Sequence, residues 1–327
     1  MKVLVTGSNG FLGAWLTRRL LADGHHVSAL VRKSSDLSEL ENAKPNFVYG
    51  DVTDKASLLE TFRGQDVIFH LAGVIGYRET DLPLLKKVNV QGTQNVVDTC
   101  AELKIPQLLH VSSVVTIGAS AGPIPLNETS HYNIAHLKMG YFDTKKQAED
   151  IIIKAVHEKR INAVCVNPST IYGSGDARKG SRKSQVKVAR GKFLFYTSGG
   201  VNVVAVEDVV DGILLALQKG KSGERYILSS ENMTIKKLFH TIADCAGVKP
   251  PPLYMPTPVL KTIGFVGDLL EPRGINLGMG RVNALTATMF HWFDHGKART
   301  DLGFTPGPSQ HAIENSVRWM KDHGYLK

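Results

Sequence analysis

The first thirteen residues, "MKVLVTGSNGFLG", constrain the fold more than any other stretch of the chain. A buried strand pattern, "KVLVTG", runs into glycines at positions 7, 10 and 13, and an amphipathic helix pattern, "GAWLTRRLLADG", follows. Gly7 permits a tight turn, and Gly13 permits the helix to pack close to the strand. A strand, a glycine turn and a helix in this order are typical of a βαβ unit in a parallel sheet.

The rest of the first half repeats this alternation. Apolar, β-branched runs of strand type alternate with helix patterns, which predicts a parallel sheet covered on both faces. Right-handed crossovers then give an α/β fold, a Rossmann-type doubly wound parallel sheet. The predicted strands lie at 25–32, 46–52, 66–73, 107–113 and 161–169, and the predicted helices at 56–64, 84–104 and 145–159.

After about residue 173 the pattern becomes irregular, and glycine, proline and basic residues become frequent. We expect a cofactor-binding domain at 1–173 with a return segment at about 201–220. Residues 174–327 are expected to form mainly a smaller, interleaved α+β domain that binds the substrate. An apolar helical stripe there either caps a hydrophobic pocket or packs the small domain. The stripe consists of Leu260, Ile263, Val266, Leu269 and Leu270.

Composition excludes several classes of protein. Hydrophobic residues make up 43% of the 327 residues and charged residues 21%, as in a soluble globular protein. The chain has three widely spaced cysteines, and their spacing is not that of metal ligands. We therefore expect no bound metal and a location in the reducing cytoplasm. No apolar run is long enough to cross a membrane.

The net charge of +9 is concentrated in part in residues 178–192, which contain seven cations and no acid. The plain interpretation is a solvated basic surface, and the sharper one is a collar that attracts an anionic substrate or cofactor. Nucleic-acid binding is disfavoured because no helix-turn-helix, zinc-finger or RNA-recognition motif accompanies these charges.

The spacing G-x-x-G-x-x-G at the start of a helix predicts a dinucleotide cofactor, with its phosphates at the helix N-terminus. Arg32 stands at the end of the second strand, where a carboxylate would favour NAD. A guanidinium suits a 2′-phosphate, so NADP(H) is favoured and NAD(H) is possible. The candidate residues of the loop are Gly7, Asn9, Gly10, Phe11, Leu12 and Gly13.

The ends of the next two strands supply further candidate cofactor residues. Asp51, with Val52 beside it, follows the third strand and is expected near the adenine. "HLAG" ends the fourth strand, where its small residues let a sugar or a nicotinamide approach. We expect His70 to be a hydrogen-bonded strand histidine rather than a base. The candidates in this motif are Leu71, Ala72 and Gly73.

Three polar side chains are placed to react. Ser113 ends the fifth strand, at the carboxyl edge of the sheet where ligands bind. Tyr141 and Lys145 are one helical turn apart, and Lys145 falls on the same helix face as the apolar residues. A buried ammonium needs a partner, and a nearby ammonium together with an oxidised nicotinamide should lower the pKa of the phenol. This arrangement predicts proton transfer by Tyr141.

Together, "TGSNGFLG", "HLAG", "VSSVVTIG", "YFDTK" and "NPSTIYGSGD" resemble an extended short-chain dehydrogenase/reductase. The tail segments "ERYILSSENMTIKKLF" and "FDHGKARTDLGFTP" resemble the dihydroflavonol-reductase-like branch of the NAD(P)-dependent epimerase/dehydratase family. The resemblance implies that Ser113, Tyr141 and Lys145 are the catalytic set.

The same resemblance implies that "NPST" lies against the nicotinamide, which adds Pro168, Ser169 and Thr170 to the cofactor residues. Asn89 matches a family position that orders the site, although it could equally cap or kink a helix. Ala205 stands where family members often carry a histidine, which puts contacts in the substrate domain in doubt.

These observations predict an NADPH-dependent oxidoreductase that reduces a ketone or aldehyde of a small organic substrate, or catalyses the reverse oxidation. A nucleotide-sugar epimerase with tightly bound NAD(P) is the alternative, and a non-catalytic, cofactor-bound regulatory protein is a third. A dehydratase is disfavoured because no Asp-Glu pair follows the strand serines. A monomer or a homodimer paired through helices at about 82–103 and 141–158 is expected.

Overall fold

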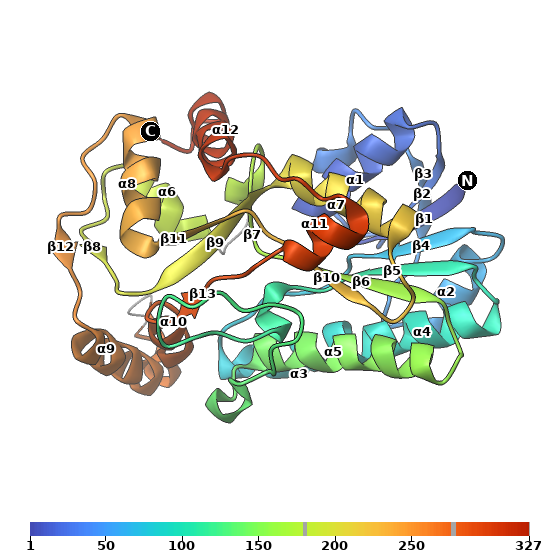
Figure 1. Cartoon of the computed structure of the whole chain (residues 1–327), viewed down its shortest axis with the longest axis horizontal. Helices are drawn as coiled ribbons and strands as arrows, with labels where there is room; N and C mark the ends of the chain where they lie inside the picture. Colours follow the sequence, from blue (N-terminus) through green and yellow to red (C-terminus); the bar gives the residue numbers. More distant parts are fainter. Residues whose placement is uncertain (179–181, 276–278, 327) are drawn as a thin grey trace.

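The computed structural model describes residues 1–178, 182–275 and 279–326 (Figure 1). Its centre is a seven-stranded parallel sheet in the order β10-β6-β5-β4-β1-β2-β3. The order reverses between β1 and β4, and ligands of such sheets bind outside the carboxyl ends of the strands at this point. The predicted doubly wound sheet is therefore confirmed. The strands are β1 (Lys2–Thr6), β2 (His26–Val31), β3 (Asn46–Tyr49), β4 (Val67–His70), β5 (Gln107–Val111), β6 (Ala163–Pro168) and β10 (Arg225–Leu228).

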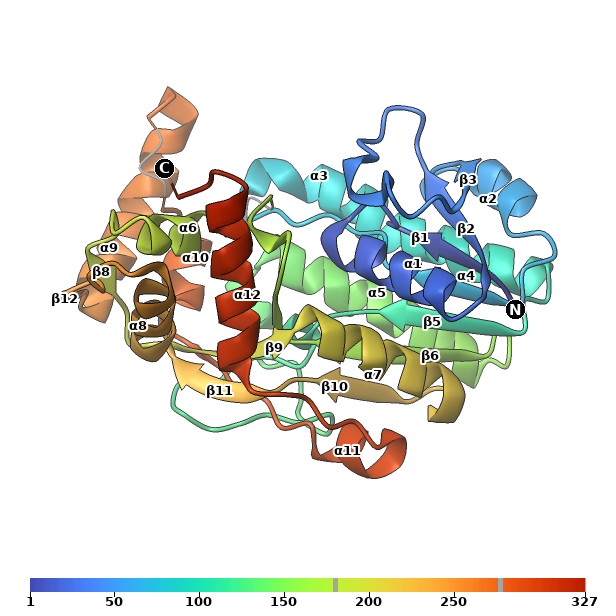
Figure 2. The ribbon, with the colours of Figure 1, turned by 90° about the horizontal axis from the view of Figure 1, so that it is seen from above.

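Helices cover both faces of this sheet (Figures 1 and 2). On one face α1 packs against α7, and α11 packs against α7 and β10. On the other face α4 packs between α2 and α5, and α3 packs against α5. The helices are α1 (Phe11–Ala22), α7 (Val206–Lys219), α11 (Gly296–Leu302), α2 (Lys55–Thr61), α3 (Leu82–Leu85), α4 (Gly92–Glu102) and α5 (Gly140–His157).

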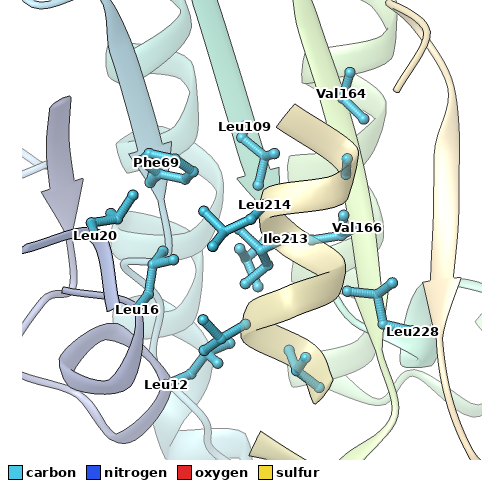
Figure 3. Packing of buried hydrophobic residues seen from close by; sticks show 14 of the residues in the cluster. Leu12, Leu16, Leu20, Phe69, Leu109, Val164, Val166, Ile213, Leu214 and Leu228 are labelled. Atoms are coloured by element: carbon cyan, nitrogen blue, oxygen red, sulfur yellow. The ribbon is translucent and has the colours of Figure 1, made fainter. Parts of the chain in front are cut away.

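Strand alternation divides the core into two layers. Val3 and Val5 of β1 belong to the cluster that contains α1 and α7, whereas Leu4 belongs to the cluster that contains α2, α4 and α5. In Figure 3, Leu16 of α1 and Ile213 of α7 lie close to the strand residues between them. Because both faces are buried, the strands are continuous apolar runs, as the sequence indicated.

The helix predicted at 84–104 is present, but it is not α-helical throughout. Residues Lys86–Gln91 form a π-helical turn between α3 and α4. In this turn the Asn89 side chain accepts from Val74 N (2.8 Å) and donates to Val74 O (3.1 Å). A π-turn adds one residue to a helical turn, and the 3.6-residue apolar pattern does not reveal the insertion. Such turns are frequent at functional sites.

A second, smaller sheet has the order β11-β9-β13, with β7 also pairing with β9. A two-stranded ribbon of β8 and β12 and five helices complete this part (Figure 2). The elements are β7 (Thr170–Tyr172), β8 (Phe195–Tyr196), β9 (Gly200–Ala205), β11 (Glu231–Thr234), β12 (Leu253–Tyr254), β13 (Phe290–His291), α6 (Lys183–Ala189), α8 (Ile235–Ala246), α9 (Thr257–Leu270), α10 (Arg281–Thr286) and α12 (Ser309–Asp322).

The two parts of the chain interleave. Within the expected return segment 201–220, α7 packs on the large sheet, whereas β9 pairs in the small one. Two later elements also belong to the part around the large sheet: β10 is one of its strands, and α11 packs against β10. The division of the chain at residue 173 stays a prediction.

The apolar stripe of α9 is only partly used for packing. Leu260 is 3% exposed, whereas Leu269 is 54% exposed. Gly264 and Gly267 let α9 approach α10 closely, because a Cβ at Gly267 would lie 2.0 Å from the carbonyl oxygen of Met279. Packing within the small domain, one of the two alternatives, accounts for Leu260.

The basic run 178–192 is not uniformly solvated. Arg182 is buried, its guanidinium lies 4.1 Å from the centre of the Tyr172 ring, and its Nε lies 3.7 Å from Asp176 Oδ2. Lys179 lies outside the described residues. Among residues 1–178, 182–275 and 279–326, no helix is long and apolar enough to span a membrane.

Candidate active site

The glycine turn between β1 and α1 requires its glycines. Gly7 has a φ of +69°, and a Cβ there would lie 2.8 Å from Ala72 N. At Gly13 a Cβ would lie 2.1 Å from the carbonyl oxygen of Gly7. Gly10 caps the N-terminus of α1. The loop therefore brings bare backbone and a helix N-terminus to the carboxyl edge of the sheet, where phosphates bind well.

A cavity of about 610 Å³ opens at this edge, and we call it the main cavity. Its wall includes the glycine loop, the ends of β4 and β5, the start of α5 and the "PST" segment after β6. The predicted site residues on its wall are Gly7, Asn9, Gly10, Phe11, Leu12, Gly13, Leu71, Ala72, Gly73, Ser113, Tyr141, Lys145, Pro168, Ser169 and Thr170.

Three predicted cofactor residues are not on this wall. Arg32 is exposed directly after β2. Asp51 follows β3, and its Oδ1 accepts from the backbone N (2.8 Å) and the hydroxyl of Thr53 (2.9 Å). Val52 is buried, and its carbonyl accepts from Asn95 Nδ2 (2.9 Å). All three lie beyond the carboxyl ends of β2 and β3, and their roles stay predictions.

His70 is a hydrogen-bonded strand histidine, as predicted. The side chain is fully buried, with Nδ1 2.9 Å from Thr6 Oγ1 and Nε2 3.0 Å from Thr93 Oγ1. Burial lowers the pKa of His70 to about 3, so the ring is neutral near pH 7. Thr6 Oγ1 also accepts from the backbone N–H groups of Leu71 and Ala72, and it thereby fixes the segment that lines the main cavity.

Lys145 points inward, which confirms the orientation predicted from helical phase. It is 7% exposed, and its Nζ donates to the carbonyl oxygen of Val111 (3.1 Å). Burial lowers the pKa of Lys145 to about 8, although the Glu149 carboxylate acts in the opposite direction. A substantial fraction of the amine is therefore an ammonium near pH 7.

The pKa of Tyr141 differs from the expectation. Burial raises it well above its ordinary value of 10.0, and Tyr77, whose ring centre is 6.1 Å away, raises it further. The Ser113 side chain lowers it only in part. In the protein without a nicotinamide, desolvation of the phenolate outweighs the nearby polar groups. The lowering expected with a bound oxidised nicotinamide stays a prediction. The phenol keeps its proton at neutral pH.

Asn89 joins the main cavity to the helix that carries Tyr141 and Lys145. Besides its two hydrogen bonds to Val74, its Nδ2 donates to Thr144 Oγ1 (3.2 Å). The Thr144 hydroxyl in turn donates to the Gly140 carbonyl within α5 (2.8 Å). Asn89 therefore fixes the cavity wall at Val74 relative to the start of α5, from within a helical kink.

Sequence reasoning missed Glu149. This side chain is 1% exposed, and its Oε1 lies 3.1 Å from Nη1 of Arg225 on β10. Glu149 follows Lys145 by four residues and thus shares its helix face, so the same helical phase could have found it. Within the described part of the chain, no group of three or more His, Cys, Asp or Glu side chains is placed to hold a metal ion.

Comparison with known proteins agrees with this geometry. The model of the NAD-dependent epimerase/dehydratase family matches residues 3–229. A putative dihydroflavonol 4-reductase from Synechocystis sp. is 30% identical over 99% of this chain and 95% of its own length. The chain belongs to the NAD-dependent epimerase/dehydratase family. It is an NAD(P)-dependent oxidoreductase of the extended short-chain dehydrogenase/reductase type.

Other members of the family share the whole chain length. Sterol demethylase protein B from Methylococcus capsulatus is 29% identical over 100% of both chains. The crystal structure of gox2253 has a TM-score of 0.89 and 31% identity, covering 100% of this chain and 99% of that one. UDP-glucose 4-epimerase from Thermotoga maritima, at 20% identity, shares the fold with a TM-score of 0.79 and 99% coverage of both chains.

Proposed function

We propose that the protein is an NADPH-dependent reductase of ketones or aldehydes carried by an apolar molecule. The observation that carries this proposal is that the Tyr141 phenol lines the main cavity together with Ser113 and Lys145. Reduction of a carbonyl needs a proton donor at the oxygen, and a tyrosine phenol is protonated at neutral pH.

The glycine loop supports a dinucleotide. Gly7 packs against the backbone of residues 71–72 and Gly13 against the backbone of Gly7, and this close packing brings the N-terminus of α1 to the main cavity. A bound nicotinamide would supply the hydride. Ser113 holds the substrate oxygen near the phenol, and Tyr141 gives it the proton. The Lys145 ammonium lies one helical turn from Tyr141 and stabilises the phenolate left after proton transfer.

The preference for NADPH over NADH rests on Arg32. Its exposed side chain follows β2, where the cofactor ribose is bound in folds of this type. A guanidinium pairs well with a phosphate and offers no acceptor to a free 2′-hydroxyl. Arg32 therefore reads the 2′-phosphate in this proposal.

The rest of the wall supports an apolar substrate. Several aliphatic side chains from different elements line the main cavity, and burying apolar surface against them favours binding by about 25 cal/mol per Å². Two relatives are named for sterol and dihydroflavonol chemistry. Such compounds have bulky, largely apolar ring systems, which agrees with this wall. The side chains are Ile75, Val114, Val115, Ile171, Val201 and Ile235.

The second candidate, a nucleotide-sugar epimerase, is favoured by one observation. Arg182 lines the main cavity, and a guanidinium suits a diphosphate. However, this side chain already donates to the Ile171 carbonyl and lies beside the Asp176 carboxylate. A diphosphate would have to displace these contacts, so the reductase is the better candidate.

The test is Tyr141→Phe, which removes the proton donor and keeps the ring. We expect the steady-state rate of NADPH consumption with a panel of apolar ketones and aldehydes to fall by roughly 10³-fold. NADPH binding, measured by fluorescence titration, should change little. The matched control is Tyr132→Phe, whose hydroxyl donates to Asp143 on the same helix but lies outside the main cavity.

Retained turnover in Tyr141→Phe would exclude the assigned donor. Interconversion of nucleotide sugars without net NADPH consumption would replace the reductase by the epimerase. Tight NADPH binding without turnover of either kind would favour the non-catalytic alternative.

A cytoplasmic location and a monomer or a homodimer paired through α4 and α5 also stay proposals.

A further inference from the structure

Glu149 lies at the centre of a buried hydrogen-bond network behind the active site. Its Oε2 accepts from Thr116 Oγ1 (3.0 Å) and from Asn167 Nδ2 (2.5 Å). Its Oε1 accepts from Arg225 Nη1 (3.1 Å). The carboxylate is 1% exposed, so each of these donors is needed to offset its desolvation.

The same donors hold the turn that presents Ser113. The Ser113 carbonyl oxygen is within hydrogen-bond distance of Asn167 Nδ2 (3.1 Å) and of Thr116 Oγ1 (2.9 Å). Thr116 has one hydroxyl proton, which either Ser113 or Glu149 can accept. Removing the carboxylate would leave Thr116 and Asn167 free to adopt other partners, and the turn would lose its fixed support.

Glu149 also provides negative charge on the same face of α5 as Lys145, one helical turn further along. The other titratable groups around Lys145 are His70 on β4, His110 on β5 and Cys165 on β6, and they are uncharged near pH 7. Burial lowers the pKa of His70 to about 3 and that of His110 well below its ordinary value, and it raises the pKa of the Cys165 thiol. The Glu149 carboxylate is thus the counter-charge of the ammonium, and Arg225 on β10 shares it.

Glu149 does not line the main cavity. It lines instead a separate cavity of about 680 Å³, whose described lining residues include Arg225, Lys146 and Asp150 and none of those of the main cavity. A ligand in the main cavity can therefore contact Ser113 and Lys145. Glu149 can act on that ligand only through these two residues.

We propose that Glu149 is a positioning residue, whose buried carboxylate is the counter-charge of the Lys145 ammonium and the anchor of the Ser113 turn. This inference rests on the proposed reductase function. It makes carbonyl reduction dependent on a carboxylate that touches neither substrate nor cofactor.

The test is Glu149→Gln, which removes the charge and keeps the size. Because the carboxylate raises the pKa of Lys145, its loss lowers that pKa, and the ammonium is lost at a lower pH. We expect the alkaline limb of the pH profile of kcat for carbonyl reduction to move down by about one unit or more. At pH 7 a downward shift of about one unit from a pKa of about 8 roughly halves the ammonium fraction, so kcat should fall about twofold or more, with little change in KM for NADPH.

Two matched variants separate charge from structure. Asp150→Asn removes a carboxylate from the same helix, but this one is exposed and paired with Lys146, so the profile should not move. Glu149→Asp keeps the charge on a shorter side chain, so the alkaline limb should stay near its original position even if kcat falls. A merely structural role would lower kcat in both Glu149 variants without moving the limb.

Arg225→Gln tests the same pair without altering Glu149, and the new amide can still donate to the carboxylate. Loss of its positive charge leaves Glu149 more effective, so the limb should move to higher pH. An unmoved limb in a folded Glu149→Gln protein, or a downward shift in Arg225→Gln, overturns the proposal.

Direct titration of Lys145 by NMR, with ¹³C-labelled lysine, gives a second readout that needs no substrate. A lower Lys145 pKa in Glu149→Gln than in Asp150→Asn supports the counter-charge. Equal values overturn it. If Tyr141→Phe keeps its turnover while the Lys145 pKa shifts as expected, the proposed function fails and the Glu149 counter-charge remains.

Discussion

The part of the main cavity formed by residues 7–13 and 71–73 contains four glycines, whereas the part formed by Val201, Ile235 and His291 consists of residues with large side chains. The first part comes from two loops that leave neighbouring strands, β1 and β4. The second comes from β9, α8 and β13, which are far apart in the sequence. We call them the cofactor wall and the substrate wall.

The two walls differ in how much change they tolerate. In the cofactor wall an added methyl group meets backbone at 2.1 Å, and backbone in a sheet core has no room to move. In the substrate wall the partly buried side chains of Val201 and Ile235 can be shortened without touching the sheet. The cofactor wall is therefore fixed by sterics, and the substrate wall is adjustable.

The sharpest test of this difference is Gly13→Ala. The new Cβ would lie 2.1 Å from the Gly7 carbonyl oxygen, so the helix must move away from the loop. We expect NADPH to bind roughly 100-fold more weakly and the melting temperature to fall by roughly 2–10 °C, as overpacking costs about 1–3 kcal/mol. Fluorescence titration and calorimetry measure both.

Gly122→Ala is the control, because a Cβ there meets nothing within 4 Å. It should leave NADPH binding and the melting temperature unchanged. If Gly13→Ala behaves in the same way, the cofactor wall is not sterically fixed and the contrast between the walls is lost.

Arg32→Asp tests a predicted cofactor residue that lies outside the cofactor wall. The substitution removes the guanidinium, and the new carboxylate accepts from a ribose 2′-hydroxyl. The ratio of NADPH to NADH affinity should therefore fall about tenfold or more. Lys33→Asp makes the same change in charge one residue further along, also at an exposed position. Equal shifts in both variants would mean that general electrostatics, and not Arg32, sets the preference.

The smallest effect is expected from Ile235→Ala in the substrate wall. Shortening this partly buried side chain removes some apolar contact, so KM for an apolar ketone should rise about fivefold. The NADPH dissociation constant should not change. Lys237→Ala, at an exposed position of the same helix, is the control. A weakened NADPH affinity in Ile235→Ala would show that the walls are not independent.

Sequence reasoning succeeded where a short stretch contains its own physical constraint. The strands of the large sheet, the glycine turn and the inward direction of Lys145 follow from local periodicity and from steric limits on glycine. It failed on the π-turn at Lys86–Gln91, where one inserted residue leaves the apolar pattern nearly unchanged. It also did not anticipate that burial raises the pKa of Tyr141 in the protein without a nicotinamide, because burial depends on elements that lie far away along the chain.

The sequence by itself determined the alternation of strands and helices, the spacing of the glycines and the side chains that stand at strand ends, because each is visible within one strand–turn–helix unit. Only the tertiary structure decided which residues support them. Arg225 of β10 reaches Glu149 of α5 across 76 positions of the chain. Such a pairing has no local signal, because the strand order that brings the two elements together is set by packing of the whole sheet.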